Sequence, residues 1–325
     1  MVRMTSPLLS VEDLRVHFDT YEGVVKALDG VGFEILDGEM FGLVGETGCG
    51  KTITALSIIR LIPENGRIIE GKILFRTENL LDRTEEEMRR LRGGKISMIF
   101  QDPTVSLNPV FTVGQQITDV IAVHQHVERK EAAERAVEAF KLVALADPEK
   151  TLKLYPHELS GGMQQRVIIA MALSSNPDML IADEPTSSVD VTIQAQLLKR
   201  LLEIKSSENL AILLITHNMG IVAETCDKVG VMYAGNVVEM GAMRGVLKNP
   251  LHPYTKGLLE AIPKPQTRAK RLPIVKGTIP DLINRPRGCA FHPRCPYTME
   301  ICRDEKPATV EIDQDKCVAC HLVKR

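Results

Sequence analysis

The sequence predicts an α/β fold, and three observations carry the prediction. Short apolar runs suited to buried strands recur along the chain. One of them, Met40–Val44, ends at a glycine-rich loop, and an apolar helical pattern follows it from Thr52 to Leu61. A long helical pattern from Val113 to about Ser175 then interrupts the alternation of strands and helices. We therefore expect an α/β core with a helical insertion.

The other predicted strands follow in chain order. They are the alternating segment Leu8–Val16, two apolar patches within Val24–Leu36, and the runs Ile96–Phe100, Met179–Ala182, Ala211–Thr216, Lys228–Met232 and Asn236–Met240. After Asn249-Pro250 prolines become frequent. Because proline ends helices and lacks the N–H that a strand ladder uses, the segment from about residue 250 is predicted to be an irregular extension.

Composition narrows the functional classes. The 325 residues suggest about two domains, and a formal net charge of −2 gives no global basic field for nucleic acid. Aromatic residues make up 4% and tryptophan is absent, which disfavours a base-stacking surface. No apolar run approaches the ~18 residues of a membrane span, and the N-terminus lacks the apolar stretch of a signal peptide. We expect a cytoplasmic protein that reaches a membrane only through spanning partners.

A phosphate-binding loop is the clearest motif. The pattern G-x-x-x-x-G-K-S/T is matched by Gly45-Glu46-Thr47-Gly48-Cys49-Gly50-Lys51-Thr52. Its glycines let successive N–H groups point at phosphate oxygens, and the following helix adds its N-terminal partial charge. Lys51 is predicted to reach the β- and γ-phosphates, and the Thr52 hydroxyl to ligate Mg²⁺. Of Cys49 only the backbone N–H is expected to matter.

Two carboxylates follow a second buried strand. The apolar run Met179–Asp183 ends in an acid, and Asp183 is predicted to hold Mg²⁺ directly or through water. Glu184 comes next, at the strand tip, where a carboxylate can orient and deprotonate an attacking water. The alternative for Glu184 is a second acid near Mg²⁺ without a role as base.

The run LSGGMQQR, Leu159–Arg166, gives the most specific signal. It resembles the signature motif of ABC ATPases, and physically it is another Ser/Gly turn that opens a helix. The resemblance implies two subunits paired head to tail. Each ATP would then lie between the P-loop of one subunit and the signature residues of the other, which here are Ser160, Gly161, Gly162 and Gln164.

Further positions match motifs of the same family. Gln101 is similar to the Q-loop glutamine, which senses Mg²⁺ and the water, and Asp190 ends a segment (187–190) that resembles the D-loop. His217 resembles the switch histidine that contacts the γ-phosphate; a buried structural histidine is the alternative. Phe18 stands where the family stacks an aromatic ring on adenine, with Tyr21 as the other candidate and an ordinary core aromatic as the plain alternative. These resemblances cover roughly residues 8–245.

The C-terminal part narrows the family. The segments Asn249–Leu259, which contains HPYT, and Gly288–Pro296, GCAFHPRCP, resemble the oligopeptide/dipeptide importer ATPases, and Phe100–Pro109 fits the same group. Pro280-Asp281-Leu282 favours the D-type of the two ATPases in such systems. The implied domains are an ABC nucleotide-binding domain, 1–250, with a helical subdomain at about 102–175, and an extension, 251–325.

The same resemblance implies partners, a location and a cargo. The partners would be a second, non-identical ABC ATPase subunit, two transmembrane permease subunits and an extracytoplasmic substrate-binding protein, with no nucleic acid. The chain would lie peripherally on the cytoplasmic face of the cell membrane and use ATP to drive peptide uptake. Oligosaccharide or nickel is the alternative cargo. A soluble ABC ATPase that acts on nucleic acid is the alternative from another class.

Five of the seven cysteines lie from Cys289 onward. In a reducing compartment such a group favours a metal or cofactor site over disulfides. Only Cys317 and Cys320 form the C-x₂-C pair that zinc sites favour. The resemblance implies that Cys289, Cys295, Cys302 and Cys320 ligate a 4Fe–4S cluster, with Cys317 close enough to compete with Cys320. Zinc and unligated thiols remain alternatives. The predicted fold class is thus α/β, a P-loop NTPase of ABC type with an antiparallel β portion, an inserted helical subdomain and an irregular Cys-containing C-terminal extension.

Overall fold

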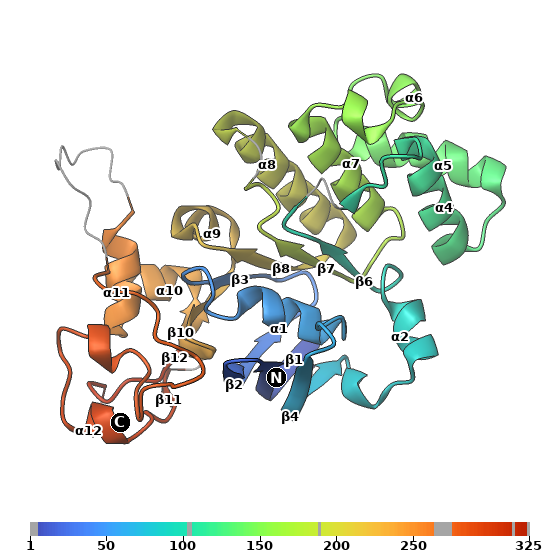
Figure 1. The fold of residues 1–325 in the computed structure, drawn as a ribbon. Helices are drawn as coiled ribbons and strands as arrows, with labels where there is room; N and C mark the ends of the chain where they lie inside the picture. Colours follow the sequence, from blue (N-terminus) through green and yellow to red (C-terminus); the bar gives the residue numbers. More distant parts are fainter. Residues whose placement is uncertain (1–5, 103–105, 188–189, 263–274, 314–315, 324–325) are drawn as a thin grey trace. The chain divides into compact units, whose positions relative to one another are not determined.

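The computed structural model describes residues 6–102, 106–187, 190–262, 275–313 and 316–323 (Figure 1). The chain divides into two compact units. The first unit combines Met1–Leu81 with Leu214–Arg325, and the second is Asp82–Leu213. Among the described residues, no helix combines the length and apolarity that crossing a bilayer requires. Strand β8 (Ala211–Thr216) crosses the point of division, and all six of its residues are buried.

An antiparallel sheet opens the first unit (Figure 1). Strand β1 (Leu9–Thr20) pairs with β2 (Gly23–Ile35) on one side and β4 (Gly66–Phe75) on the other, and β4 pairs with β5 (Glu78–Asn79). The register shifts between Val11 and Leu14. An extra residue inverts the alternation of side chains, so Leu9, Val11, Leu14 and Val16 can all be buried. The sequence patterns predicted β1 and β2; β4 was missed because its apolar residues stand in two adjacent groups, Ile68-Ile69 and Ile73–Phe75, and do not alternate with polar ones.

A second set of strands carries the glycine loop. β3 (Met40–Val44) is buried at every residue and runs parallel to β9 (Lys228–Tyr233), which pairs antiparallel with β10 (Asn236–Ala242). Such a continuous apolar run suits a strand that is covered on both faces. Helix α1 follows β3 through the glycine loop. The helices of this part are α1 (Lys51–Ile58), α9 (Met219–Thr225) and α10 (Met243–Lys248).

The residues after 250 contain more regular structure than predicted. They form helix α11 (Pro253–Glu260), the short helix α12 (Ile301–Asp304), and strands β11 (Val310–Asp313) and β12 (Lys316–Val318). Strand β12 pairs antiparallel with β10, and β11 pairs with β12. The prediction of irregular structure is therefore wrong for these segments. Strands of three or four residues show no readable alternation; pairing with β10 stabilises β12, and pairing with β12 stabilises β11.

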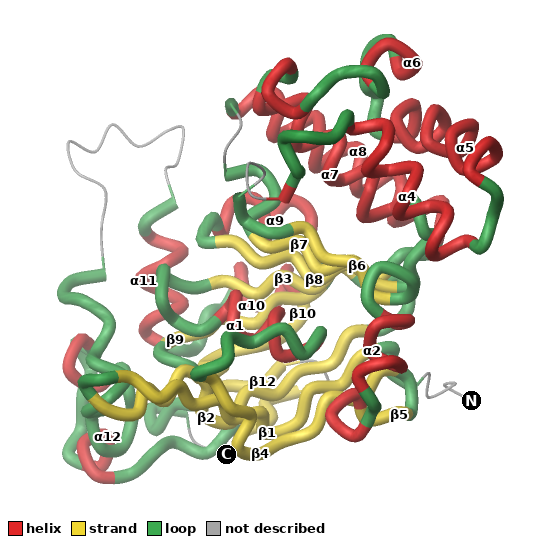
Figure 2. Tube along the Cα trace, turned by 45° about the vertical axis from the view of Figure 1, so that its right-hand side comes forward, coloured by secondary structure: helices red, strands yellow, loops and turns green. Residues whose placement is uncertain are grey.

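The second unit contains a parallel strand pair and most of the helices (red in Figure 2). β6 (Ile96–Ile99) and β7 (Met179–Asp183) pair from Ile96↔Met179 to Ile99↔Ala182. The helices are α2 (Glu85–Leu91), α4 (Val113–Gln125), α5 (Arg129–Leu142), α6 (Pro148–Thr151), α7 (Gly161–Leu173) and α8 (Val191–Glu208). Three-residue 3₁₀ turns lie at Leu80–Asp82, Pro156–Glu158 and, in the first unit, His292–Arg294. Thr84 and Thr112 begin α2 and α4 with capping boxes, which fixes where these helices start.

Candidate functional site

The glycine loop lies between the end of β3 and the start of α1. A Cβ on Gly45 would lie 2.2 Å from the carbonyl oxygen of Met232, so the first position of the loop has room only for glycine. Gly48 and Gly50 have φ values of 84° and 109°, which side chains rarely tolerate. Thr47 and Gly48 are exposed. The loop therefore approaches the neighbouring strand closely on one side and reaches solvent on the other.

Helix α1 starts without a side-chain cap. Gly50 occupies the N-cap position, and no side chain bonds to the first-turn amides. These amides carry the positive end of the helix dipole and have no partner within the helix, which makes such a terminus an anion site. Thr52, in the first turn, is exposed and offers a hydroxyl there.

Lys51 is folded back onto its own loop. Its ammonium group donates to the carbonyl oxygens of Gly45 at 2.7 Å and Glu46 at 3.0 Å, and it lies 3.7 Å from the Cys49 sulfur. Burial raises the pKa of the Cys49 thiol, so that side chain stays neutral beside the lysine. The Cys49 amide donates to the Glu46 carbonyl. A phosphate would give Lys51 new acceptors in place of these carbonyls.

In the second unit, β6 and β7 bring three predicted residues to one edge of the strand pair. Their parallel pairing places Gln101, two residues after Ile99, near the edge where Asp183 ends β7. Asp183 is 1% exposed, whereas Gln101 is exposed. Glu184 has a φ of 49°, a left-handed conformation that costs a side chain about 1–3 kcal/mol and that the surrounding structure must hold.

The signature turn begins α7. Ser160 is the N-cap, its hydroxyl accepts from the Met163 amide at 3.4 Å, and both Ser160 and Gly161 are exposed. Gln164 turns its amide group back to donate to the Pro156 carbonyl at 2.7 Å. The side chain of Gln164 therefore supports the preceding loop.

Gln165 is a residue that the sequence patterns did not single out. It is 2% exposed, and its amide nitrogen donates at 2.5 Å to the carbonyl of Pro185. Pro185 directly follows Glu184, so this bond connects the signature helix to the catalytic candidate within the second unit. Gln165 can be located within the signature run, but the sequence does not predict its hydrogen-bond partner, Pro185, 20 positions away.

The remaining family positions occupy element ends. Asp190 caps α8, because its carboxylate accepts from the amides of Thr192 and Ile193, each at 3.0 Å. Residues 188 and 189 of the predicted D-loop lie outside the described residues. His217 follows β8 and is exposed, so the alternative of a buried structural histidine is wrong.

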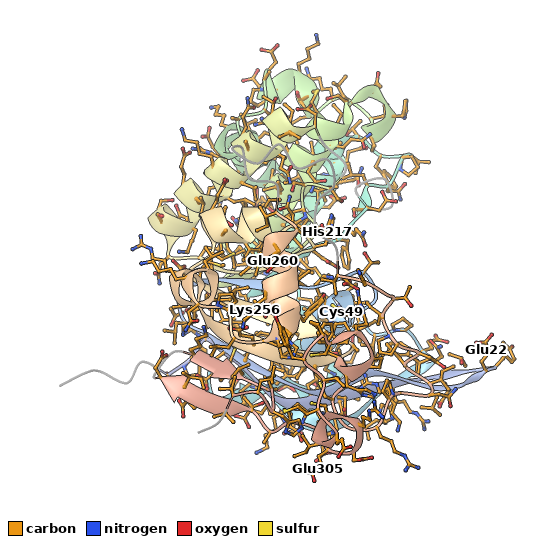
Figure 3. All side chains as sticks on the ribbon, turned by 90° about the vertical axis from the view of Figure 1, so that its left-hand side faces the viewer. Glu22, Cys49, His217, Lys256, Glu260 and Glu305 are labelled. Atoms are coloured by element: carbon orange, nitrogen blue, oxygen red, sulfur yellow. The ribbon has the colours of Figure 1, made fainter. Side chains whose placement is uncertain are left out.

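The two adenine candidates differ in exposure. Phe18 is half-buried on β1, and its ring lies over Gly66, where a Cβ would approach it to 2.5 Å. Tyr21 lies fully exposed in the β1–β2 turn, beside Glu22, which marks the projecting tip of the hairpin (Figure 3). Both candidates belong to the unit that carries the glycine loop.

Four of the C-terminal cysteines are electrostatic neighbours. Burial raises the pKa of Cys289 to about 11, and charge on Cys302, Cys320 and Cys295 would raise it further. Burial also raises the pKa of Cys295 and of Cys320, and a negative charge on Cys302 would act on both in the same direction. The Cys289 amide donates to the Cys302 carbonyl at 2.9 Å.

Cys317 has different surroundings. Burial raises its pKa, and the charges that act on it are those of Glu311 and Glu239. Charges on the predicted cluster ligands would thus act on one another, whereas carboxylate charges act on Cys317. Within the described residues, however, no three or more His, Cys, Asp or Glu side chains are placed to hold a metal ion. The donor chemistry suits a metal cluster, but the arrangement does not close around one.

The extension also contacts the glycine loop. Arg294 forms a two-pronged ion pair with Glu46, and the Tyr254 hydroxyl accepts from the Glu46 amide at 3.0 Å. Both residues lie in segments that carry the family resemblance, yet nothing in those segments indicated that they touch the loop. The contact is long-range, so only the tertiary structure could reveal it.

Comparison with known proteins agrees with this geometry. Residues 28–187 match the ABC transporter family model, and residues 238–302 match that of the oligopeptide/dipeptide transporter C-terminal region. A probable peptide ABC transporter ATP-binding protein of Sinorhizobium fredii is 48% identical over 96% of this chain and 94% of its own length. A dipeptide transport ATP-binding protein of Bacillus subtilis is 45% identical over 97% and 94%.

Among solved structures, a dimeric bacterial ABC transporter cassette is similar with a TM-score of 0.66, at 25% identity, over 73% of this chain and 99% of that one. The P-loop, the signature turn and the acidic end of β7 are therefore parts of an ABC-type ATPase. The chain belongs to the ABC transporter ATP-binding proteins, in the group that carries the oligopeptide/dipeptide transporter C-terminal region, and it hydrolyses ATP to drive transport.

Proposed function

We propose that this chain is the ATP-hydrolysing subunit of a peptide importer. One observation carries the proposal: a P-loop cassette and the C-terminal region occur in one chain that matches peptide transport ATP-binding proteins over nearly its whole length. Oligosaccharide or nickel as cargo, and action on nucleic acid, have no comparable support. The D-type resemblance and the full-length match favour a role beside a second, non-identical ATPase subunit.

The P-loop would hold the phosphates of ATP. The uncapped amides of α1 provide donors, and Lys51 exchanges loop carbonyls for β- and γ-phosphate oxygens. The Thr52 hydroxyl, the Asp183 carboxylate and the Gln101 amide are oxygen donors of the kind that Mg²⁺ takes. Bound Mg²⁺ would offset phosphate charge. Phe18 is the better candidate for stacking on adenine, because β1 fixes its ring, and exposed Tyr21 is the alternative.

The remaining residues complete the reaction. Glu184 would orient and deprotonate the attacking water, and His217 would contact the γ-phosphate. The exposed turn Ser160–Gly162, with Gln164 supporting it and Asp190 at the start of α8, would meet ATP bound to a partner ATPase subunit. Each composite site then contains one P-loop and one signature turn from different subunits.

The assembly would include two transmembrane permease subunits and an extracytoplasmic substrate-binding protein. The chain would lie peripherally on the cytoplasmic face of the membrane. Helices α4 to α7 fall within the helical subdomain proposed at about 102–175, inside a nucleotide-binding domain of residues 1–250 that the extension, 251–325, follows. The exposed start of that stretch, near Val110 and Phe111, offers apolar surface to a permease helix.

Reconstitution tests this proposal. Purified chain, partner ATPase and permease subunits in liposomes should hydrolyse ATP faster when a peptide-loaded binding protein is added outside. Glu184→Gln should lower hydrolysis by about 10²–10⁴-fold while the complex still binds ATP, because the general base is lost. Stimulation by DNA or ribosomes, with no response to permease, would overturn the proposal. Loading the binding protein with oligosaccharide or nickel separates the cargo alternatives.

We further propose that Cys289, Cys295, Cys302 and Cys320 ligate a 4Fe–4S cluster. Support comes from their grouping apart from Cys317, which faces Glu311 and Glu239. Four thiolates satisfy such a cluster, and its binding free energy would stabilise a proline-rich segment. Zinc on the same thiols is the alternative.

Anaerobic purification with iron, sulfide and zinc analysis tests the cluster. Wild type and Cys317→Ser should contain about four irons per chain, the stoichiometry of such a cluster, and Cys320→Ser should lose them. An iron-free, zinc-loaded wild type would replace the cluster with zinc. If the wild type contains no metal and melts at the same temperature as Cys320→Ser, the thiols are unligated.

A further inference from the structure

The second residue of the P-loop, Glu46, is held by the C-terminal extension. Its carboxylate binds Arg294, which is 248 positions away in the sequence, and its amide binds the Tyr254 hydroxyl, 208 positions away. All three residues belong to the first unit. Neither contact is needed to form a phosphate loop, whose glycines and lysine are local, so the pair is an addition to the motif.

Arg294 has every guanidinium nitrogen engaged. Its two terminal nitrogens lie 2.9 and 3.0 Å from the two carboxylate oxygens of Glu46, the fork geometry that suits a carboxylate. The same nitrogens also donate to the Tyr233 hydroxyl at 3.3 Å and the Val275 carbonyl at 3.0 Å, and Nε donates to Lys276 at 2.8 Å. The side chain is 5% exposed, against 29% for Glu46. A buried fork of this kind leaves the carboxylate little freedom.

An aromatic group supports the second contact. Tyr254 and Tyr233 are fully buried, with ring centroids 4.7 Å apart, and Phe291 packs edge-on to Tyr233 at 5.1 Å. The guanidinium carbon of Arg294 lies 5.6 Å from the centre of the Tyr233 ring. Phe291 precedes the short 3₁₀ turn His292–Arg294 and Arg294 ends it, so one stretch of the extension provides both the packing and the charge. In Figure 3, Cys49 marks the P-loop, and Lys256 and Glu260 mark α11, the helix on which Tyr254 lies.

Glu46 connects these contacts to the phosphate-binding lysine. Its carbonyl and that of Gly45 receive the Lys51 ammonium, and the same Glu46 carbonyl accepts from the Cys49 amide. The Glu46 N–H shares one planar peptide group with the Gly45 carbonyl, so the bond to Tyr254 orients that carbonyl, while the ion pair with Arg294 restrains the residue that carries the second carbonyl. The extension therefore sets where Lys51 and the turn at Cys49 lie before ATP arrives.

We propose that Arg294 and Tyr254 are positioning residues of the ATP site, which act through Glu46 to hold the P-loop and Lys51 ready for the phosphates. The inference rests on the proposed ATP site. ATP affinity thus depends on the folding of the C-terminal extension, and neither residue needs to touch ATP.

A merely structural role is the competing explanation, and the chain offers a matched control for it. Arg285 is another buried arginine of the extension, 12% exposed, and it pairs with Asp29 at 3.2 Å. It also donates to the Lys26 carbonyl, so its bonds go to residues on β2 and not to Glu46. Loss of either arginine should lower the melting temperature, but only loss of Arg294 should weaken ATP binding.

The experiment measures the affinity of the purified full-length chain for a fluorescent Mg-ATP analogue, together with its melting temperature. Arg294→Gln should weaken binding by about 10-fold or more, because hydrogen bonds to charged groups contribute about 1.5–3 kcal/mol. Arg294→Lys should recover part of the loss. Tyr254→Phe, which keeps the packing, should weaken binding by about fivefold, the equivalent of one neutral hydrogen bond. Arg285→Gln should leave the affinity unchanged.

A double-mutant cycle gives the decisive readout. Glu46→Gln combined with Arg294→Gln should weaken binding no more than either change alone, because both remove one interaction. Additive losses, or an equal loss in Arg285→Gln, would overturn the inference. If Arg294→Gln does not fold, Tyr254→Phe decides: unchanged affinity rejects the role of Tyr254 and the mechanism with it. Lys51→Ala tests the proposed ATP site separately from the positioning role of Arg294 and Tyr254. Unchanged affinity in that variant would reject the ATP site itself.

Discussion

The P-loop and the signature turn share one local structure, a glycine-containing turn at which a helix begins. The P-loop leaves α1 without a side-chain cap, keeps Lys51 within the loop and has its second residue held by the extension. The signature turn has its own cap in Ser160 and no cation until Arg166, which donates to the Val143 carbonyl at 2.7 Å. One turn is thus equipped to hold the triphosphate tail of ATP, whereas the other offers only weak, exposed donors.

This difference indicates that the two turns contribute to ATP binding in different ways. A cation and preformed amides give affinity to a single chain. The signature turn is exposed, and its own Ser160 side chain already caps the helix, so alone it contributes little to ATP affinity. It contributes once another subunit presents bound ATP to it. Changes in the P-loop should therefore alter ATP binding by the isolated chain, and changes in the signature turn should alter only activity in the assembly.

The largest effect should come from the pair Lys51→Ala and Ser160→Ala. Lys51→Ala should weaken ATP binding by the isolated chain by about 10²-fold, because charge-assisted hydrogen bonds to two phosphates are lost. Ser160→Ala should leave that affinity unchanged but reduce hydrolysis in the reconstituted importer, measured by phosphate release. Ser160→Thr keeps the cap and controls for helix fraying. Equal binding loss in Ser160→Ala would contradict the division of roles.

A smaller, structural effect should separate the glycines of the two turns. Gly45→Ala would push a methyl against the Met232 carbonyl at 2.2 Å and should lower the free energy of unfolding by about 3 kcal/mol, the upper part of the range for overpacking. Gly162→Ala meets only the Ile193 side chain at 3.3 Å, within a helix that favours alanine. It should change stability by less than about 1 kcal/mol. Denaturant unfolding of both variants checks this, and a stable Gly45→Ala would show that the strand can move away.

The smallest effect is a loss of stability at acidic pH. It arises at His252, two residues before Tyr254, in the part of the extension that contacts the P-loop. Burial lowers the pKa of His252 from 6.5 to about 3 in the folded chain, and its Nδ1 accepts from the Tyr254 amide at 3.1 Å. Above pH 6.5 both states are neutral at this residue, so its contribution to stability is complete. Below pH 6.5 the unfolded chain binds the proton first, and stability falls until the pH reaches the folded pKa.

Between pH 6.5 and 5 this linkage should lower the free energy of unfolding by up to about 2 kcal/mol. Denaturant titrations at several pH values measure the slope. His252→Asn, which keeps an acceptor at the N-cap of α11, should reduce the slope, and replacing exposed His157, near the signature turn, should not. An unchanged slope in His252→Asn would mean that other groups control the acid response.

Much of the candidate site was predictable because its chemistry is local. Glycines at fixed spacing before Lys51 form a phosphate loop within eight residues, and β7 ends in acids directly after an apolar run. Strands β11 and β12 were not predictable, since runs of three or four residues carry no period; β12 forms by pairing with β10, and β11 by pairing with β12. The exposure of His217 could not be predicted either, because a sequence motif identifies a residue but does not show which side chains pack over it.

The sequence by itself determined the family, the P-loop, the signature turn and the acidic strand end, because each is a contiguous pattern whose spacing follows from backbone geometry. Only the tertiary structure decided that Arg294 holds Glu46 and that Gln165 reaches Pro185. Those contacts join residues far apart in the chain. Packing of whole elements selects them, and no local pattern encodes which distant partner a buried charge or amide will meet.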